Sequence, residues 1–340
     1  MGTQEIGIVG AGSWGTALAI LLAQKGLRVD QWVYETDLCQ KMTESRENYQ
    51  YLPGYRLPDL IHLTSDLKRT VSGKSIILIV VPTHVVRKVA TDLTPYLSPQ
   101  CLVINASKGI ENDSLCLIHQ ILKQTIHVPF TPVTLSGPTF AREIASGVPS
   151  ALVAAGENME TAERVQEFFT TPRLKIFTST DIIGVEVGGS LKNVIAIAAG
   201  ISDGLGLGHN ARAALITRGL VEITRIGTAL GARPETFYGL SGIGDLVLTC
   251  TGDLSRNRNV GLQLGQGLTL DKITQGMSMV AEGILTVKSA FNLKNKLNIQ
   301  ASVIDETYRI LHEGKPPRQA LNDLMQVSIS SEFAGVKGLE

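Results

Sequence analysis

The feature that most constrains this chain is a glycine-rich turn between an apolar run and a helical pattern near its start. A short apolar run leads into Gly10-Ala11-Gly12-Ser13-Trp14-Gly15, and an Ala/Leu-rich pattern continues to Lys25. In this order Gly10 permits a tight turn, Gly12 lets backbone approach a pyrophosphate, and Gly15 permits close helix–strand packing. The helix N-terminus then offers N–H groups to phosphates. The pattern predicts a dinucleotide site; the alternative is an ordinary strand–helix turn.

The end of the second apolar run bears on the choice of dinucleotide. Leu27 to Val33 is followed by Tyr34-Glu35, and Glu35 lies 20 residues after Gly15. A carboxylate there would accept hydrogen bonds from the adenosine ribose and repel a 2′-phosphate, which favours NAD over NADP. If Tyr34 faces the ribose instead, that discrimination weakens. The sequence therefore predicts NADH or NADPH without choosing between them.

Strand and helix patterns alternate along the first half of the chain. Strands are predicted at Ser75 to Val81, Cys101 to Ala106, Val133 to Leu135, Ala151 to Ala155 and Leu174 to Thr178, and helices at His84 to Leu93 and Met159 to Phe169. This alternation predicts the α/β class, with a Rossmann-like, doubly wound parallel sheet. Residues 1–180 are accordingly expected to form a dinucleotide-binding domain.

Beyond about residue 180 the strand patterns stop and helical patterns take over. Helices are predicted at Asp181 to Ile201, Asn210 to Leu230, Val280 to Leu293, Ile299 to Glu313 and Gln319 to Met325, and the tail from Ser328 is expected to fray. We therefore expect residues 181–340 to form an all-helical domain that carries substrate-binding and catalytic groups. Ligands of open α/β sheets bind at the carboxyl ends of the strands, where such groups would be needed.

Composition excludes several classes of partner. Lys plus Arg total 31 and Asp plus Glu total 31, so no basic field indicates nucleic acid. Apolar runs such as Ile76 to Val81 fall short of a bilayer span, so no membrane insertion is expected. The four cysteines and six histidines show no metal-ligand spacing, and we predict no metal site. With no signal-like start, the chain is expected in the cytoplasm.

A lysine beside two glycines is the second informative feature. Gly188 and Gly189 precede Lys192 by four and three residues, and so share its face in a predicted helix. Glycines inside a helix cost roughly 1 kcal/mol each relative to alanine, so a close approach of backbone or ligand must offset them. The apolar neighbours of Lys192 would lower the pKa of its ammonium group. The alternative is a lysine that extends to solvent over a helix-packing notch.

Other polar residues follow predicted strands or turns. Lys108 comes directly after a strand, and the small-residue loop from Ser136 to Ala141 follows the next one. Ser107 and Ser136 could equally cap helices. Ser255-Arg256-Asn257 combines a hydroxyl, a guanidinium and an amide, all suited to phosphate. Asp245 follows a glycine-rich turn, where it either caps a helix or orients Lys192 or a substrate hydroxyl.

Taken together, these motifs resemble the bacterial-type NAD(P)-dependent glycerol-3-phosphate dehydrogenases, from about Ile6 to about residue 325. The matching blocks are Gly10-Ala11-Gly12-Ser13-Trp14-Gly15-Thr16-Ala17, Ser107-Lys108-Gly109-Ile110-Glu111, Leu135-Ser136-Gly137-Pro138-Thr139-Phe140-Ala141, Gly188-Gly189-Ser190-Leu191-Lys192-Asn193, Gly242-Ile243-Gly244-Asp245-Leu246, Ser255-Arg256-Asn257 and Ala281-Glu282-Gly283. The chain departs from the family at Tyr34, where members often carry His or Arg near the adenosine phosphate.

The resemblance implies reversible reduction of dihydroxyacetone phosphate to sn-glycerol 3-phosphate, a precursor of phospholipids. It implies that Lys192 exchanges the proton at the C2 oxygen. Implied substrate contacts are Lys108, Gly137, Thr139, Lys192, Asp245, Ser255, Arg256 and Asn257. Implied cofactor contacts, beyond the three turn glycines, are Ser13, Trp14, Tyr34, Lys108, Ala141, Arg256, Val280 and Glu282. It also suggests a homodimer through the helical half.

Two alternatives to this function stay open. One is another two-domain NAD(P) dehydrogenase, which would need a different catalytic pair or different substrate cations in place of Lys192 and Ser255-Arg256-Asn257. The other is a non-catalytic module that senses a dinucleotide. The presence of Lys192 with Lys108 and Arg256 argues against such a silent module.

Overall fold

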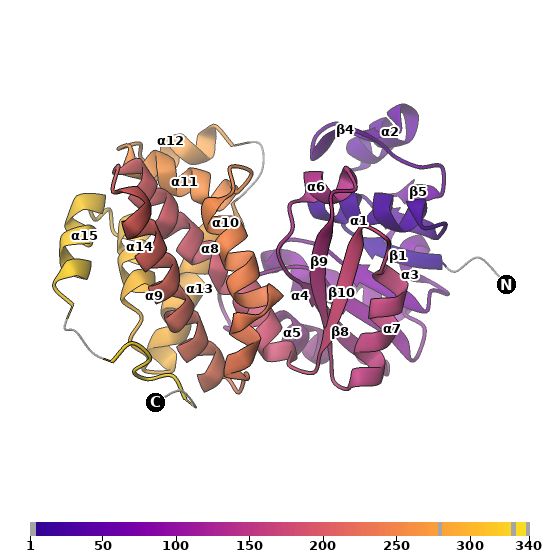
Figure 1. Ribbon diagram of the computed structural model, residues 1–340. Helices are drawn as coiled ribbons and strands as arrows, with labels where there is room; N and C mark the ends of the chain where they lie inside the picture. Colours follow the sequence, from indigo (N-terminus) through magenta and orange to yellow (C-terminus); the bar gives the residue numbers. More distant parts are fainter. Residues whose placement is uncertain (1–4, 278–280, 328–330, 338–340) are drawn as a thin grey trace. The chain divides into compact units, whose positions relative to one another are not determined.

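The computed structural model describes residues 5–277, 281–327 and 331–337. The chain divides into two compact units (Figure 1). Unit 1 comprises Met1–Ser107 and Ile118–Ile182, and unit 2 comprises Lys108–Leu117 and Ile183–Glu340. The sequence analysis placed one boundary at residue 180. The structure adds the excursion of Lys108–Leu117, which leaves unit 1 after a strand and belongs to unit 2.

An eight-stranded sheet forms the centre of unit 1, in the order β10-β9-β8-β7-β6-β1-β2-β5. The strands are β1 (Glu5–Val9), β2 (Arg28–Trp32), β5 (Ile61–Thr64), β6 (Ile76–Ile79), β7 (Cys101–Asn105), β8 (Phe130–Ser136), β9 (Ser150–Gly156) and β10 (Leu174–Ser179). The order reverses between β1 and β6, which is the switch point where such sheets bind ligands. The glycine-rich turn follows β1 directly.

The predicted Rossmann-like sheet is confirmed, and it is mostly parallel. One pair departs from this, because β8 and β9 are antiparallel and β10 runs parallel to β9. The connection between β8 and β9 contains the short helix α6 (Ala141–Ala145). The alternation of strand and helix patterns in the sequence does not reveal this reversal.

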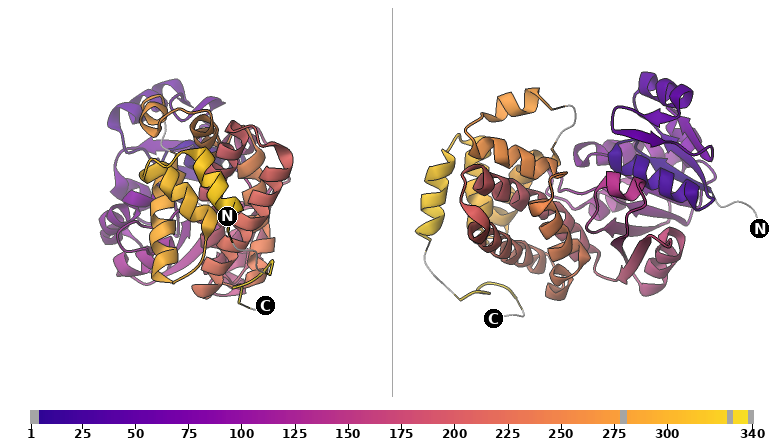
Figure 2. Two further views of the ribbon diagram at one scale, coloured as in Figure 1. Left: turned by 90° about the vertical axis from the view of Figure 1, so that its left-hand side faces the viewer. Right: turned by 45° about the horizontal axis from the view of Figure 1, so that its top comes forward.

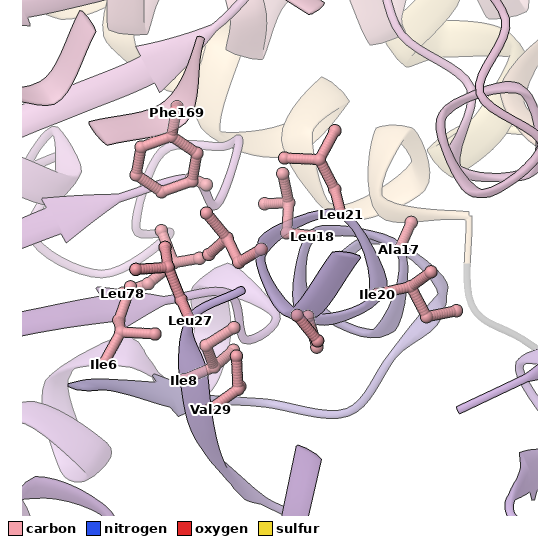
Figure 3. Close-up of a cluster of buried hydrophobic side chains, with 14 of the residues drawn as sticks. Ile6, Ile8, Ala17, Leu18, Ile20, Leu21, Leu27, Val29, Leu78 and Phe169 are labelled. Carbon is pink, nitrogen blue, oxygen red and sulfur yellow. The ribbon is translucent and has the colours of Figure 1, made fainter. Parts of the chain in front are cut away.

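Helices and a small second sheet complete unit 1. The helices are α1 (Ser13–Gln24), α2 (Thr36–Ser45), α3 (Leu67–Val71), α4 (Thr83–Leu93), η1 (Thr94–Tyr96), α5 (Ile118–Thr125) and α7 (Met159–Phe169), and β3 (Glu47–Asn48) pairs with β4 (Leu52–Arg56). Figure 3 shows Leu18 and Leu21 of α1 in one apolar cluster with Ile6 and Ile8 of β1, and Phe169 at the edge of the cluster. Burial of both faces explains why β6 and β7, in the middle of the sheet, read as nearly continuous apolar runs.

Unit 2 is helical, and no strand occurs in its described residues. Its helices are α8 (Ile182–Gly204), α9 (Gly208–Ala229), η2 (Pro234–Tyr238), η3 (Leu240–Gly244), α10 (Asp245–Thr251), α11 (Arg256–Gly265), α12 (Leu270–Gln275), α13 (Glu282–Lys296), α14 (Ser302–His312) and α15 (Pro317–Met325). The long helices pack side by side (Figure 2). All five helices predicted from the sequence are present, with their ends shifted by a few residues.

Helix α8 is the buried central helix of unit 2. It is long and apolar enough to cross a membrane, with a mean hydropathy of 1.5, yet 94% of that window is buried. A core helix of a globular protein passes the same test, so this is weak evidence for a span. In the sequence this helix reads as shorter apolar runs, because Glu186, Lys192 and Asn193 interrupt it. All three side chains are buried.

Glycines bring α8 and α11 into backbone contact. A Cβ added at Gly200 would lie 2.0 Å from the carbonyl oxygen of Arg258. One added at Gly261 would lie 2.0 Å from the carbonyl oxygen of Ile197. Any side chain at either position would force the helices apart, and so the glycines fix how closely α8 approaches α11.

Part of the tail is packed, where the sequence predicted fraying. Val336 is fully buried. On α9, Arg225 donates from Nε to the carbonyl oxygen of Ala334 at 2.6 Å, and Arg218 donates to that of Glu332 at 2.8 Å. The expectation of fraying is wrong at these contacts, because two main-chain carbonyls of the tail accept hydrogen bonds from α9 and the Val336 side chain is buried.

Candidate active site

The glycine-rich turn of unit 1 has the geometry that its motif requires. Gly10 has a φ of 125°, and a Cβ there would lie 2.3 Å from the carbonyl oxygen of Val80. A Cβ at Gly15 would lie 2.4 Å from the carbonyl oxygen of Gly10. At Gly12 no atom of the described chain lies within 4 Å of an added Cβ. Two glycines therefore allow close packing, while the third faces open space.

The start of α1 fits an anion. Gly12 occupies the N-cap position, no side chain caps the helix, and its first turn holds no acidic residue within the described chain. Main-chain N–H groups and the helix dipole thus face the open side of the turn, an arrangement suited to a pyrophosphate. Ser13 donates from its hydroxyl to the carbonyl oxygen of Tyr51 at 2.6 Å, and the next residue, Trp14, is half-buried. These residues fit a dinucleotide.

The two residues predicted to face the ribose are both exposed. Strand β2 ends at Trp32, and the Tyr34 side chain is 76% exposed. Glu35 precedes α2 without capping it, and the Tyr51 hydroxyl donates to its carboxylate at 3.1 Å. Tyr51 thus orients Glu35 through its hydroxyl and accepts the hydrogen bond of Ser13 through its main-chain carbonyl. The Glu35 carboxylate therefore has a hydrogen-bond partner, whereas the Tyr34 ring packs edge-on against Trp32.

The loop after β8 holds three further predicted contacts. Gly137 has a φ of 136°, and a Cβ there would lie 3.1 Å from the Cα of Leu152. Thr139 donates to the carbonyl oxygen of Gly137 at 3.4 Å, and Ala141 begins α6. All three lie beyond the carboxyl end of a sheet strand, the position expected of ligand-binding residues.

The helix-cap alternative is wrong for both strand-end serines. Phe140, not Ser136, is the N-cap of α6, and the Ser136 hydroxyl is buried without a partner in the described chain. Ser107 instead accepts a hydrogen bond from the N–H of Val81 at 3.0 Å, which joins the ends of β7 and β6.

In unit 2 one buried carboxylate bridges two lysines. Asp245 is fully buried, and its Oδ2 accepts from Lys108 Nζ at 2.7 Å while its Oδ1 accepts from Lys192 Nζ. Thr249 adds a hydroxyl near the same Oδ1, at 3.5 Å. Asp245 does not cap α10, because Gly244 is the N-cap. Of the two roles open for Asp245 from sequence, the structure shows the one that orients Lys192.

The glycines beside Lys192 explain how Asp245 reaches it. A Cβ at Gly188 would lie 2.5 Å from the carbonyl oxygen of Ser241. The missing side chain thus lets the turn that precedes Asp245 press against α8 one helical turn before the lysine. Lys192 is 6% exposed and does not extend to solvent. The space beside Gly188 is filled by the backbone at Ser241, so the close approach of another backbone, expected from the sequence, is present.

Burial controls the charge of Lys192. It lowers the pKa of this ammonium to about 8, with Asp245 opposing the shift and Lys108 adding to it. A lysine in this state gives up and recovers a proton near neutral pH, which suits general acid–base chemistry. Glu282, at the start of α13, is the acidic counterpart. Burial raises its pKa to about 7, against the attraction of Arg256, Lys108 and Lys192.

The predicted phosphate-binding trio divides into three different roles. Ser255 is the N-cap of α11, where its hydroxyl accepts from the N–H of Arg258 at 3.2 Å. Asn257 is buried, and its amide bonds to Asn193 and to the N–H of Gly283. Arg256 is the exposed member. Within the trio, its guanidinium is therefore the group presented to an anion.

One predicted residue lies outside the described part of the chain, and three residues of the site were not predicted. Val280, expected at the cofactor, lies outside the described residues. Sequence reasoning gave no role to Asn193, Gly283 or Thr249, although the first two lie in its quoted motifs. Asn193 and Gly283 both bond to Asn257, which is far from each of them in sequence, so no local pattern reveals these contacts. Within the described residues no cluster of His, Cys, Asp or Glu could hold a metal ion.

Comparison with known proteins places the chain in a family. The NAD-dependent glycerol-3-phosphate dehydrogenase N-terminus matches residues 5–162, and the C-terminus of the same family matches residues 181–322. The chain belongs to the NAD-dependent glycerol-3-phosphate dehydrogenase family. The resemblance expected from the motifs is thereby confirmed, and with it membership of a family of nicotinamide-dependent oxidoreductases.

Individual members of the family are similar over nearly the whole chain. Glycerol-3-phosphate dehydrogenase [NAD(P)+] from Geobacter sulfurreducens is 50% identical over 332 residues, covering 97% of this chain and 99% of that protein. The protein of the same name from Syntrophotalea carbinolica is 51% identical over 331 residues, with the same shares covered. A crystal structure of glycerol-3-phosphate dehydrogenase from Coxiella burnetii has a TM-score of 0.92 and 40% identity, covering 95% and 99% of the two chains.

Proposed function

We propose that this chain catalyses the reversible reduction of dihydroxyacetone phosphate to sn-glycerol 3-phosphate, with NADH or NADPH as reductant. The observation that carries the proposal is the pair of lysines held by the buried carboxylate of Asp245, in a chain of this family. One of them, Lys192, has a pKa lowered to about 8, as a proton donor and acceptor needs.

The nicotinamide, when bound, supplies the hydride that reduces C2 of the substrate. The carbonyl oxygen at C2 then becomes an alkoxide, and Lys192 gives it a proton. In the reverse direction the neutral Lys192 amine removes the hydroxyl proton as hydride leaves C2. Proton transfer of this kind contributes about 10²–10⁴ in rate. Overall, ketone, reduced cofactor and one proton yield alcohol and oxidised cofactor.

Other residues would bind and orient the two ligands. Arg256 presents a fork of donors that matches a phosphate group. Lys108 supplies a second positive charge, held in place by Asp245. In unit 1 the turn from Gly10 to Gly15 would hold the pyrophosphate, with Ala141, Gly137 and Thr139 beyond β8. Use of the product for phospholipids, a cytoplasmic location and a homodimer belong to the proposal by family resemblance.

The decisive experiment replaces the proton donor. We expect the wild-type protein to oxidise NADH or NADPH when dihydroxyacetone phosphate is added, followed by cofactor absorbance. Lys192→Ala should lose about 10²–10⁴ in kcat, because no other group replaces its proton, while cofactor affinity by fluorescence titration changes little. Lys272→Ala, at an exposed lysine of α12, is the matched control and should retain full activity.

Two results would overturn the proposal. If the wild-type protein oxidises neither cofactor with this substrate, the chain is another two-domain dehydrogenase or a non-catalytic dinucleotide sensor. If Lys192→Ala retains more than a few per cent of the rate, roughly the lower bound of a proton-transfer contribution, Lys192 is not the donor.

A further inference from the structure

Unit 2 contains three charged residues whose next neighbours in the sequence take part in the same buried chain of hydrogen bonds. They are Lys192, Arg256 and Glu282, and the residues that follow them are Asn193, Asn257 and Gly283. The three pairs come from α8, from the first turn of α11 and from the first turn of α13. Segments far apart in sequence thus meet through the neighbours of the charged groups.

The chain of bonds runs through the Asn257 amide. Its Nδ2 donates to Oδ1 of Asn193 at 2.9 Å, and its Oδ1 accepts from the N–H of Gly283 at 3.0 Å. Asn193 is 6% exposed and Asn257 is 9% exposed. A Cβ at Gly283 would lie 2.6 Å from Oδ1 of Asn257, so glycine is needed for this contact.

The orientation of the amide follows from these partners. The main-chain N–H of Gly283 can only donate, so the oxygen of Asn257 must face it and the nitrogen must face Asn193. A buried amide that lost either partner would cost about 1–3 kcal/mol, so this one arrangement is strongly favoured. The amide therefore holds α11 against α8 on one side and the start of α13 on the other.

We propose that Asn257 is a positioning residue, whose amide sets the relative placement of the segments that carry Lys192, Arg256 and Glu282. This inference rests on the proposed function. It differs from the role that the sequence suggested for Asn257, which was direct contact with the substrate. A misplacement of about 1 Å in such a constellation costs about 10²-fold in rate, so a residue of this kind affects turnover without touching the reacting atoms.

Two substitutions break this chain of hydrogen bonds, one at Gly283 and one at Asn257. Gly283→Ala places a methyl group against Oδ1 of Asn257 and leaves Asn257 itself unchanged. Asn257→Leu removes the amide and keeps the number and branching of the side-chain heavy atoms, and Asn257→Ser replaces it if the leucine variant does not fold. For each variant, kcat and KM for dihydroxyacetone phosphate would be measured over pH, together with the thermal midpoint. Gly276→Ala and Asn259→Ala are the controls, because neither residue takes part in the hydrogen bonds of the Asn257 amide.

The controls match the tested positions in kind. Among the described residues, a Cβ at Gly276 meets no atom closer than 3.7 Å, and Gly276 has a φ of −84°, which alanine adopts freely. Asn259 lies on the same helix as Asn257, but its amide donates to a carbonyl oxygen in an exposed setting, that of Asp253. Both controls should keep the wild-type kcat and KM.

If Asn257 positions these segments, the effects of substituting Gly283 and Asn257 on turnover depend on each other. We expect each single variant to lower kcat about 10- to 100-fold, with KM for the substrate changing less than about threefold. The double variant should be no slower than about the slower single variant, because both break the same contact. The pH midpoint of kcat should also move, since the setting of Lys192 changes; a merely destabilised fold would not produce that shift.

Other outcomes would overturn the inference. If Asn257→Leu raises KM about tenfold with kcat preserved while Gly283→Ala behaves as wild type, Asn257 contacts the substrate directly. Additive losses in the double variant would show two independent effects. Hydrogen exchange at the Gly283 amide provides a readout without activity, and it should accelerate in Asn257→Leu. It separates failure of the inference from failure of the proposed function, which an inactive wild-type protein would show.

Discussion

At the scale of single residues, the charge of Lys192 depends on three influences that act in different directions. Burial lowers the pKa of its ammonium, Asp245 raises it, and Lys108 lowers it further. Because Asp245 bonds to both lysines, the carboxylate keeps Lys192 protonated while holding the second cation close. The pKa of about 8 is the balance of these influences, and it can be moved by removing one of them.

We predict opposite pH dependences for the two directions of the reaction. Reduction needs protonated Lys192, so kcat/KM for dihydroxyacetone phosphate should fall as pH rises through about 8. Oxidation of glycerol 3-phosphate needs the neutral amine and should increase over the same range. Asp245→Asn removes the attraction that raises the pKa, and both midpoints should move to lower pH. Midpoints that stay in place or move upward would contradict this account.

The sequence identified these groups but not their connection. Lys108, Lys192 and Asp245 each follow a strand or a glycine pattern, and that is a local signal. The contacts between them join residues 137 and 53 positions apart. For Asp245 the sequence therefore left a helix cap and a lysine partner equally open. Only the fold, in which Gly188 admits the turn before Asp245, distinguishes the two.

Cofactor choice is a second question at the residue scale. Glu35 lies just beyond β2 and is held by the hydroxyl of Tyr51. A carboxylate at this position repels a 2′-phosphate, whereas an arginine attracts it. We predict that Glu35→Arg raises the ratio of kcat/KM for NADPH to that for NADH about tenfold, because the substitution reverses the charge beside the 2′-phosphate. An unchanged ratio in steady-state kinetics would show that Glu35 points away from the ribose.

At the scale of elements, close packing of α8 and α11 places Lys192 and Arg256 on two helices whose backbones touch. We predict that Gly261→Ala destabilises unit 2, although alanine normally favours a helix by about 1 kcal/mol. The added Cβ would lie 2.0 Å from the carbonyl oxygen of Ile197, and relief of that overlap costs about 1–3 kcal/mol. Thermal unfolding measures the effect, with Gly276→Ala as the control. A midpoint that rises would show that the helices separate freely.

Elements with a strong pattern are those that the sequence predicted well. Helix α7 has the predicted bounds, Met159 to Phe169, because its apolar positions recur at helical spacing and Asn158 caps it. Strand β5 was missed because it is short, with two of its four residues only half-buried. Helices α10 and α12 are also short, and long-range contacts rather than local propensity stabilise such elements.

At the scale of the whole molecule, the chain crosses between the two units more often than its sequence suggests. Lys108–Leu117 lies between β7 and α5 of unit 1 but belongs to unit 2. Ile110 and Leu117 are buried, pair with each other through one bridge, and pack in the apolar core of the helical unit. A sequence pattern cannot show this, because a short apolar segment fits either core.

This crossing predicts that two isoleucines six positions apart stabilise different units. Ile104 of β7 is buried in the core of unit 1, and Ile110 is buried in that of unit 2. Truncation of either to alanine should cost about 2–5 kcal/mol through the lost contacts and the cavity left behind. Both tryptophans, Trp14 and Trp32, lie in unit 1, so their fluorescence reports that unit alone, whereas far-UV circular dichroism reports both.

In urea unfolding, Ile104→Ala should therefore shift the fluorescence transition to lower denaturant. Ile110→Ala should instead shift an early part of the circular dichroism transition and leave the fluorescence midpoint nearly in place. The two variants remove the same group from equally buried sites, so a difference in signal reflects only which core was weakened. Identical shifts in both signals would mean that the units unfold as one cooperative block, and Ile110 would then stabilise the whole molecule rather than the helical unit.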